Sequence, residues 1–331
     1  MSRIAKRVSY PFTGHQPALA AIERRTVPSR EDVVAFFRTH ERQEWSLSEL
    51  LDVSADDIAI DELTESDLYV VESAMLVESN NPDYVANLLE YFQADEHACD
   101  FIAMWAIEEW KHYYVLRDYL AKVRAALAAR TAGEADDSAH LREIVESALS
   151  DQVSDVREAS HENWGIPAHY LPVQVVASTT LQEFVTAEFY RNHAGTTREP
   201  TLSRIEMLLA KDETRHEMFY ETKMRDILEA QPDLLPATLE ALKEFAMPGG
   251  YLLDQYDERR TAMEQAAFPT LATKRNAFRR VFNKLERMVG RANAMQVLVE
   301  GDYLADGKEE SVRQRSRPAL IARLITAHVA G

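Results

Sequence analysis

Two short motifs in this sequence each place a glutamate and a histidine three residues apart. They are Glu109-Trp-Lys-His112 and Glu213-Thr-Arg-His216. On a helix, residues at this spacing lie on one face, so the carboxylate and the imidazole can bind the same metal ion. One such motif alone is weak evidence, because about one arises by chance in a chain of this length with its histidine content.

Each motif is preceded by a further glutamate at nearly the same distance. Glu78 lies 31 residues before Glu109, and Glu183 lies 30 residues before Glu213. A helix with one glutamate followed by an antiparallel helix with Glu-x-x-His, repeated once, brings four carboxylates and two imidazoles into the centre of a four-helix bundle. The doubled unit therefore predicts a metal centre. Its expected ligands are Glu78, Glu109, His112, Glu183, Glu213 and His216.

Carboxylate oxygens with one imidazole for each ion favour iron or manganese over zinc or copper. We expect two iron ions, with manganese or mixed occupancy as the alternative. The single cysteine, Cys99, excludes an intramolecular disulfide and a cysteine-rich zinc or iron–sulfur site. The alternative for either motif is a solvated pair on a helix surface. However, both motifs lie on apolar stripes, and exposing these stripes would forfeit the core.

The elements that must position these residues are helices, and the hydrophobic pattern predicts an all-α protein. Long stretches between 10 glycines and 12 prolines carry apolar residues at three- and four-residue spacing. The four ligand helices are expected at residues 65–92, 95–131, 169–193 and 200–229. We also expect a short helix at 29–51, a polar helix at 140–158 and a basic helix at 274–291.

We predict a single domain in three parts. Residues 1–65 form an irregular lead-in with a short helix, residues 66–230 form the metal-binding bundle, and residues 231–331 form helices packed on it. No run of about 18 apolar residues without a charge occurs, which predicts no membrane span. The basic start lacks the apolar stretch of a signal peptide, so we expect the cytoplasm. A net charge of −18 argues against nucleic-acid binding.

The residues around the expected ligands resemble the soluble acyl-acyl-carrier-protein desaturases, a ferritin-like di-iron family. That family carries Glu-Glu-x-x-His on its second ligand helix, here Glu108 to His112. Its fourth ligand helix carries Asp-Glu-x-x-His-Glu, here Asp212 to Glu217. The resemblance covers roughly residues 40 to 250. One departure is Trp110-Lys111, which replaces the family's usual Asn-Arg.

The other two ligand helices match that family as well. Its first ligand glutamate lies four residues before a proline, as Glu78 lies before Pro82. Its third ligand glutamate follows a glutamine and precedes a threonine by three residues, as Glu183 follows Gln182 and precedes Thr186. The resemblance implies a ferritin-like four-helix bundle with a central di-iron site and additional flanking helices.

The resemblance also implies an activity and partners. It implies an O2-dependent oxidoreductase that introduces a cis double bond into an acyl chain carried on acyl carrier protein. Electrons would come from a ferredoxin-type donor, and the protein would be a homodimer. Trp45, Asp212 and His112 would form a hydrogen-bonded electron route, and Thr186 would stand beside the oxygen site as a proton donor. Otherwise Trp45 plugs the core and Thr186 bonds within its helix.

Other functions remain open at this point. Hydroxylation, N-oxygenation or halogenation would use the same metal site, and a non-enzymatic iron-binding bundle needs no substrate. A ribonucleotide reductase subunit would need a radical tyrosine, for which Tyr113 and Tyr190 are candidates by neighbourhood.

Two further groups of charged residues have open roles. Four acidic residues near the ligands lie either at the surface or around the ligands: Glu108, Glu188, Glu206 and Glu217. An acidic carrier protein needs a local basic patch for docking, although a solvated helix explains the same run of cations equally well. The candidate patch is Lys274, Arg275, Arg279, Arg280, Lys284, Arg287 and Arg291.

Overall fold

The computed structural model describes residues 45–130, 139–150, 170–245 and 256–300. Within these ranges every regular element is a helix and no strand occurs, which confirms the all-α prediction. Most of the expected lead-in falls outside the described residues, and so does the second half of the expected polar helix. The three-part division of the chain stays a prediction.

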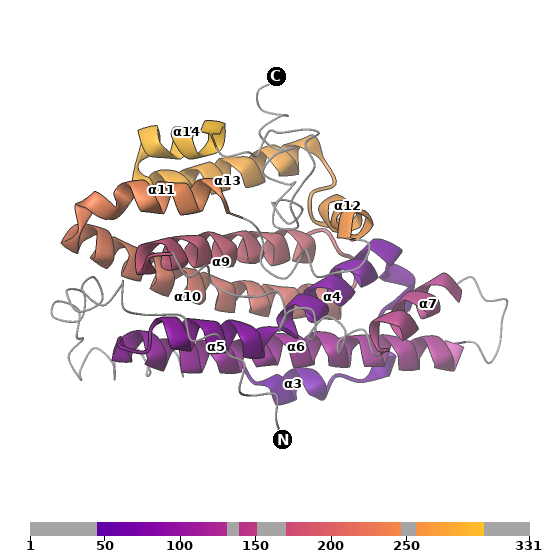
Figure 1. Ribbon diagram of the computed structural model, residues 1–331. Coiled ribbons are helices and arrows are strands. Elements are labelled where there is room, and N and C mark those ends of the chain that lie inside the picture. Colours follow the sequence, from indigo (N-terminus) through magenta and orange to yellow (C-terminus); the bar gives the residue numbers. More distant parts are fainter. Residues whose placement is uncertain (1–44, 131–138, 151–169, 246–255, 301–331) are drawn as a thin grey trace.

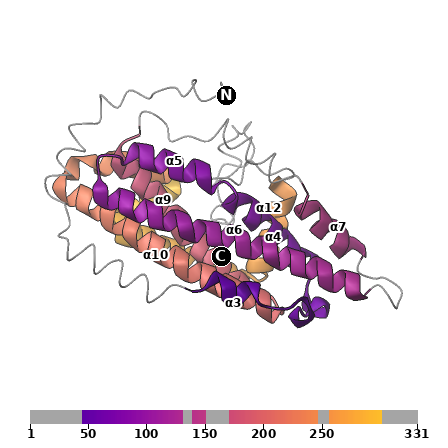
Figure 2. The same cartoon turned by 90° about the horizontal axis from the view of Figure 1, so that it is seen from below.

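The helices form three layers (Figure 1). In that view α5 and α6 lie low, with α3 beneath α6, and α4 slopes upward from α6 toward α12. Helices α9 and α10 lie above α6, and α11, α13 and α14 lie above these. Seen from below, α5, α6 and α10 lie side by side (Figure 2), and α3 packs against α6. The helices are α3 (Leu47–Leu51), α4 (Glu65–Glu78), α5 (Asn81–Tyr91), α6 (Glu96–Arg130), α7 (Ala139–Ala148), α9 (Pro172–Ala194), α10 (Pro200–Ala230), α11 (Leu235–Lys243), α12 (Tyr256–Ala267), α13 (Leu271–Val289) and α14 (Arg291–Glu300).

The starts of the ligand helices follow from local sequence. The hydroxyl of Thr64 accepts from the backbone N–H of Asp67, whose carboxylate accepts from the Thr64 N–H, a capping box that begins α4. Proline occupies the first position of both α9 and α10, where its missing N–H costs nothing. The side chain of Glu199 accepts from the Leu202 N–H at 2.6 Å and caps α10.

The expected helix at 65–92 is wrong in one respect, because the chain breaks it into α4 and α5. Pro82 lies in the first turn of α5 and has no N–H to donate to the carbonyl four residues earlier, which belongs to Glu78. Just after the end of α4, the hydroxyl of Ser79 donates to the carbonyl of Leu76 at 2.7 Å. Glu78 is therefore the last residue of α4 rather than the middle of a long helix.

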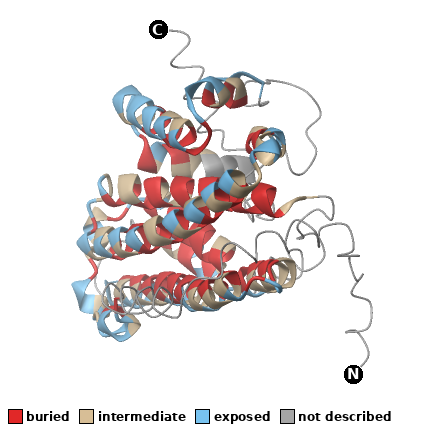
Figure 3. Ribbon diagram, turned by 90° about the vertical axis from the view of Figure 1, so that its left-hand side faces the viewer, coloured by how far each residue is buried: buried red, intermediate tan, exposed pale blue. Residues whose placement is uncertain are grey.

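The buried apolar side chains of the described residues form two clusters. Along α6, Trp105 belongs to one cluster and Leu116 to the other, with the Glu-x-x-His motif between them. Along α10 the order is reversed, from Leu209 to Tyr220, again with the motif between. Buried positions face the interior of the bundle and exposed positions line its outside (Figure 3). A polar layer therefore crosses the bundle between two apolar cores.

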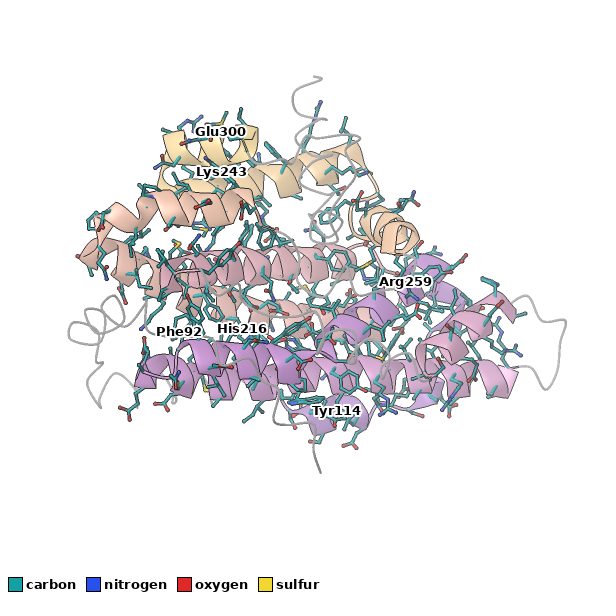
Figure 4. The ribbon with its side chains drawn as sticks, viewed as in Figure 1. Phe92, Tyr114, His216, Lys243, Arg259 and Glu300 are labelled. Atoms are coloured by element: carbon teal, nitrogen blue, oxygen red, sulfur yellow. The ribbon has the colours of Figure 1, made fainter. Side chains whose placement is uncertain are left out.

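The outer helices are held to the bundle by charged contacts. Arg259 of α12, labelled in Figure 4, donates to both carboxylate oxygens of Glu72 on α4, at 2.5 and 3.2 Å. Lys284 of α13 is completely buried and donates to Glu217 and Glu221 of α10. The prediction that Lys284 belongs to an exposed basic face is therefore wrong. Breaking such a buried pair typically costs about 3–5 kcal/mol.

The basic helix also ends earlier than expected. Gly290 follows α13 with a φ of 82°, a left-handed conformation that glycine adopts without a steric cost. Arg291 therefore begins α14 instead of ending α13. None of the helices in the described ranges combines the length and the apolar character needed to cross a membrane.

A buried cluster of three charged side chains joins α4, α9 and α10 away from the Glu-x-x-His motifs. His193 Nδ1 lies 2.6 Å from Glu206 Oε1, and His193 Nε2 lies 3.0 Å from Asp67 Oδ1. Burial lowers the pKa of His193, but Glu206 and Asp67 together raise it to about 9. Burial also raises the pKa of Glu206, whereas for Asp67 the effect of burial is outweighed by hydrogen bonds to His193 and Thr64, which hold its pKa below the usual value. The raised pKa of His193 favours its imidazolium form between these two acidic side chains at neutral pH.

The His193 cluster predicts a pH dependence of stability. Because the pKa of His193 is higher in the folded chain, its stabilisation is complete below about pH 6.5 and is lost as the pH rises through about 9. In metal-free protein we expect this loss to be about 3 kcal/mol. Urea unfolding of the parent and of His193→Gln at several pH values measures it. Parallel profiles for the two proteins would contradict the assignment.

Candidate metal centre

Six buried side chains from α4, α6, α9 and α10 converge in the polar layer. Figure 4 places His216 in the interior between α6 and the α9–α10 pair. The six form two overlapping groups, in each of which one potential ligand atom per residue lies within 4.8 Å of the others. Glu109 and Glu213 belong to both groups. The first group adds Glu78 and His112, and the second adds Glu183 and His216.

The first group surrounds the Nδ1 atom of His112. This atom lies 3.4 Å from Glu213 Oε1, 3.6 Å from Glu109 Oε2 and 3.9 Å from Glu78 Oε1. His112 Nδ1 is buried and has no hydrogen-bond partner, which is the arrangement expected of an atom that binds a metal.

The second group repeats this arrangement around His216. Its Nδ1 atom lies 3.1 Å from Glu109 Oε1 and 3.4 Å from one oxygen of each of Glu183 and Glu213. Glu183 Oε1 is buried and has no hydrogen-bond partner. In both groups the histidine directs the same ring nitrogen toward the carboxylates.

The other nitrogen of each histidine is held by an acidic residue. His112 Nε2 lies 3.2 Å from Asp212 Oδ2, and His216 Nε2 lies 2.8 Å from Glu108 Oε2. Arg215 donates to both of these carboxylates, at 2.6 Å to Glu108 and 2.5 Å to Asp212. Carboxylates on the outer nitrogens fix the ring orientation and raise the basicity of the inner ones.

The predicted chain from Trp45 to His112 is present in the structure. Trp45 Nε1 donates to Asp212 Oδ2 at 2.6 Å, and the same oxygen faces His112 Nε2. Lys111 Nζ donates to the Trp45 carbonyl at 3.1 Å and lies 4.6 Å from the centre of the indole ring. Trp45 also packs in one of the apolar cores, so it fills the core and donates to Asp212 at the same time. Its role in electron transfer stays a prediction.

Thr186 lies one turn after Glu183 on α9 and is half-buried. Its hydroxyl makes no hydrogen bond with the described residues, whereas Thr179 and Thr180 of the same helix donate to the carbonyl four residues earlier. The alternative in which Thr186 bonds within its helix is therefore not observed. Its proposed role near the oxygen site stays a prediction.

The four acidic residues with open roles are all buried. Glu108 supports His216, and Glu206 binds His193. Glu188 accepts from Arg191 and Arg280, with an Arg280 distance of 2.8 Å. The fourth, Glu217, holds the buried lysine of α13 described above. Burial thus decides against a surface position for all four.

Two contacts of the centre were not anticipated. Tyr190 donates to Glu78 Oε1 at 2.9 Å, and Arg215 joins the two supporting carboxylates. Arg215 lies inside the second motif and three residues after Asp212, which is a signal for an ion pair on one helix face. No comparable signal exists for Tyr190, because 112 residues separate it from Glu78.

The pKa values of the carboxylates in the centre are shifted in different directions. Burial and the charge of Glu109 raise the pKa of Glu78 well above its usual range, and burial and Glu213 do the same for Glu183. Burial also raises the pKa of Glu109, but the two histidines outweigh it and hold that pKa below its usual value.

The pKa values of the two histidines are also shifted. Burial lowers the pKa of His112 and His216, but hydrogen bonds to the surrounding carboxylates raise both well above the usual value. Without a cation, protons must offset the negative charge of the four glutamates. A pair of divalent cations fits this donor set, since hard oxygens and one imidazole per ion suit iron.

The comparisons with known proteins agree with this geometry. The sequence model described as "Fatty acid desaturase" matches residues 46–276, which is more than half of the chain. This range contains all six converging side chains, together with Asp212 and Thr186. No match was found among curated proteins.

Proposed function

Because the chain belongs to the fatty acid desaturase family, a ferritin-like di-iron family, we propose that it introduces a cis double bond into an acyl chain carried on acyl carrier protein, using O2. The observation that carries the proposal is the pair of overlapping Glu–His groups with two shared carboxylates. Two iron ions would supply the removal of hydrogen from unactivated C–H bonds, which side chains alone cannot perform.

We propose that Glu109 and Glu213, which belong to both groups, would help to hold both ions. Glu78 with His112 would complete one ligand shell, and Glu183 with His216 the other. Asp212 and Glu108 hold the outer nitrogens, so both imidazoles present Nδ1 to the metal. The apolar clusters on both sides of the polar layer exclude water from the ligands.

Electrons and protons must reach this buried site from outside. We propose that a ferredoxin-type donor delivers electrons through Trp45 and Asp212 to His112, along the hydrogen bonds already described. For Thr186 we propose proton donation, because its hydroxyl lies one turn from Glu183 and is not engaged by the described residues. A hydroxyl in this position can supply a proton within hydrogen-bond reach.

The decisive experiment is product analysis. Iron-loaded protein is supplied with acyl carrier proteins of several chain lengths, a ferredoxin system and O2, and the released acyl chains are identified by mass spectrometry. Desaturation gives a product lighter by two hydrogen atoms, whereas hydroxylation gives one heavier by an oxygen atom. An unchanged acyl chain with every carrier substrate, despite loaded iron, would refute the proposed activity.

For carrier docking we propose the exposed cations of α13, which are Arg275, Arg279 and Arg287. Arg280 is bound to Glu188, so it contributes less to such a patch. Replacing Arg275 and Arg279 with glutamate should raise the KM for acyl carrier protein and leave kcat unchanged. An unchanged KM would remove α13 from consideration.

We further propose a cytoplasmic homodimer. Ile107 and Tyr114 lie exposed on the outer face of α6, where Trp110 stacks on Tyr114 at 5.6 Å. Figure 4 shows Tyr114 at the lower surface of the molecule. We propose this apolar face of α6 as the contact between the two subunits. Sedimentation analysis separates a dimer from the large hollow assembly expected of an iron store, and cell fractionation tests the compartment.

A further inference from the structure

Tyr190 touches the proposed metal centre without being a ligand. Its hydroxyl donates to Glu78 Oε1 at 2.9 Å, and its side chain is 2% exposed. The contact joins α9 to the last residue of α4, directly before the break at Ser79. Glu78 is thus a carboxylate shared between a phenol and the ligand group around His112.

This contact has a chemical consequence. A phenol that loses an electron becomes a strong acid, so a tyrosine in a water-free interior is oxidised only where an acceptor can take its proton. Proton transfer requires an acceptor at hydrogen-bond distance, about 2.6–3.2 Å. Glu78 meets this requirement, and it also lies in the first ligand group. The acceptor of the proton and the acceptor of the electron therefore lie within one site.

Two of the other buried tyrosines, Tyr119 and Tyr220, lack this combination. Tyr220 lies one turn after His216, and its hydroxyl has no hydrogen-bond partner. Tyr119 donates to Glu199 at 2.9 Å, but Glu199 caps α10 and belongs to neither ligand group. Of Tyr119, Tyr190 and Tyr220, it is Tyr190 whose hydroxyl donates to a proposed ligand.

We propose that Tyr190 is a redox-active side chain that gives one electron to the oxidised metal pair when no substrate is bound. The O–H bond of Tyr190 breaks, and the proton forms a new O–H bond with the carboxylate of Glu78. The electron from Tyr190 reduces the metal pair by one oxidation equivalent. Tyr190 is thereby left as a neutral phenoxyl radical. The oxidant is the iron pair after reaction with O2, so this inference rests on the proposed function.

The test uses rapid freezing and electron paramagnetic resonance. Protein loaded with ferrous iron under anaerobic conditions is mixed with O2 without acyl carrier protein or electron donor, and frozen at increasing times. We expect a tyrosyl radical signal in the parent and in Tyr220→Phe, and its loss in Tyr190→Phe. Tyr220→Phe is the matched control, because it removes a buried hydroxyl near His216 that has no proton acceptor.

The outcomes separate this inference from the proposed function. Iron content and optical absorption report whether the pair is bound and oxidised. Oxidised iron without a radical in the parent, or an unchanged signal in Tyr190→Phe, overturns the role of Tyr190 alone. Absence of bound iron overturns both proposals. If Tyr190→Phe binds no iron, 3-fluorotyrosine at position 190 keeps the hydroxyl, and an unaltered radical spectrum then overturns the assignment.

Discussion

Replacement of both Glu109 and Glu213 with alanine is expected to abolish iron binding, from about two ions per chain in the parent to none. The two residues belong to both ligand groups, so each ion loses two carboxylates at once. Iron content after reconstitution and gel filtration measures the effect. Glu206→Gln is the matched control, because Glu206 is an equally buried glutamate of α10 that binds His193 instead.

The same double variant should remain folded. In the metal-free parent Glu109 repels Glu78, but it also binds the protonated His112 and His216, which hold the pKa of Glu109 below its usual value. Its removal relieves one repulsion and breaks favourable buried pairs, so we expect the metal-free variant to unfold at a lower temperature than the metal-free parent. Far-UV circular dichroism at the assay temperature shows whether the variant is folded. A variant that is unfolded there would lose iron for a reason unrelated to its ligands.

Protons compete with iron for this site. The pKa values of Glu78, Glu183, His112 and His216 all lie above their usual range in the metal-free chain. Each ligand must lose its proton before it binds, so metal binding releases protons and iron affinity must rise with pH. Titration calorimetry in buffers of different ionisation enthalpy counts these protons.

Iron retention by the variant that lacks both Glu109 and Glu213 would contradict the ligand assignment.

The convergence of the six side chains could be predicted because it depends on local rules. Glu-x-x-His places two groups on one helix face, and the repetition of the unit at similar spacing brings two such faces together. Apolar stripes then decide that these faces are buried. The structure brings all six together, although the break after Glu78 was not anticipated.

Contacts between distant residues could not be predicted in this way. A pattern indicates which face of a helix is buried, but not which residue of another helix lies opposite. Tyr190 and Glu78 are one example, and the burial of Lys284 between two glutamates of α10 is another. Charge spacing on α13 suggested a solvated stripe, because it contains no information about acidic residues more than 60 positions earlier.

The contact between Trp45 and Asp212 was anticipated for a different reason. They are separated by 167 residues, and nothing in the pattern of this chain connects them. Only the resemblance of the surrounding motifs to a known family suggested the hydrogen-bonded chain. Long-range polar contacts of this kind can be predicted from the resemblance to a family. They cannot be predicted from the periodicity or spacing of residues in one sequence.

Trp45→Phe is expected to slow reduction of the metal centre by a protein donor about 10- to 100-fold, while iron content stays unchanged. Phenylalanine keeps an aromatic ring in the core but has no N–H to donate to Asp212. The contact from Lys111 Nζ to the backbone carbonyl at position 45 does not depend on the side chain. The substitution therefore removes the hydrogen bond to Asp212, together with part of the ring that packs in the core and faces Lys111.

The rate of reduction is measured by stopped flow, with reduced ferredoxin and with a small chemical reductant in parallel. Trp105→Phe is the matched control, since Trp105 is also buried beside a histidine of the centre but its Nε1 has no hydrogen-bond partner. If Trp45 only fills the core, its replacement lowers the free energy of unfolding and leaves both reduction rates unaltered. A route through Trp45 instead slows reduction by ferredoxin more than reduction by the small molecule, because the latter can reach the centre elsewhere.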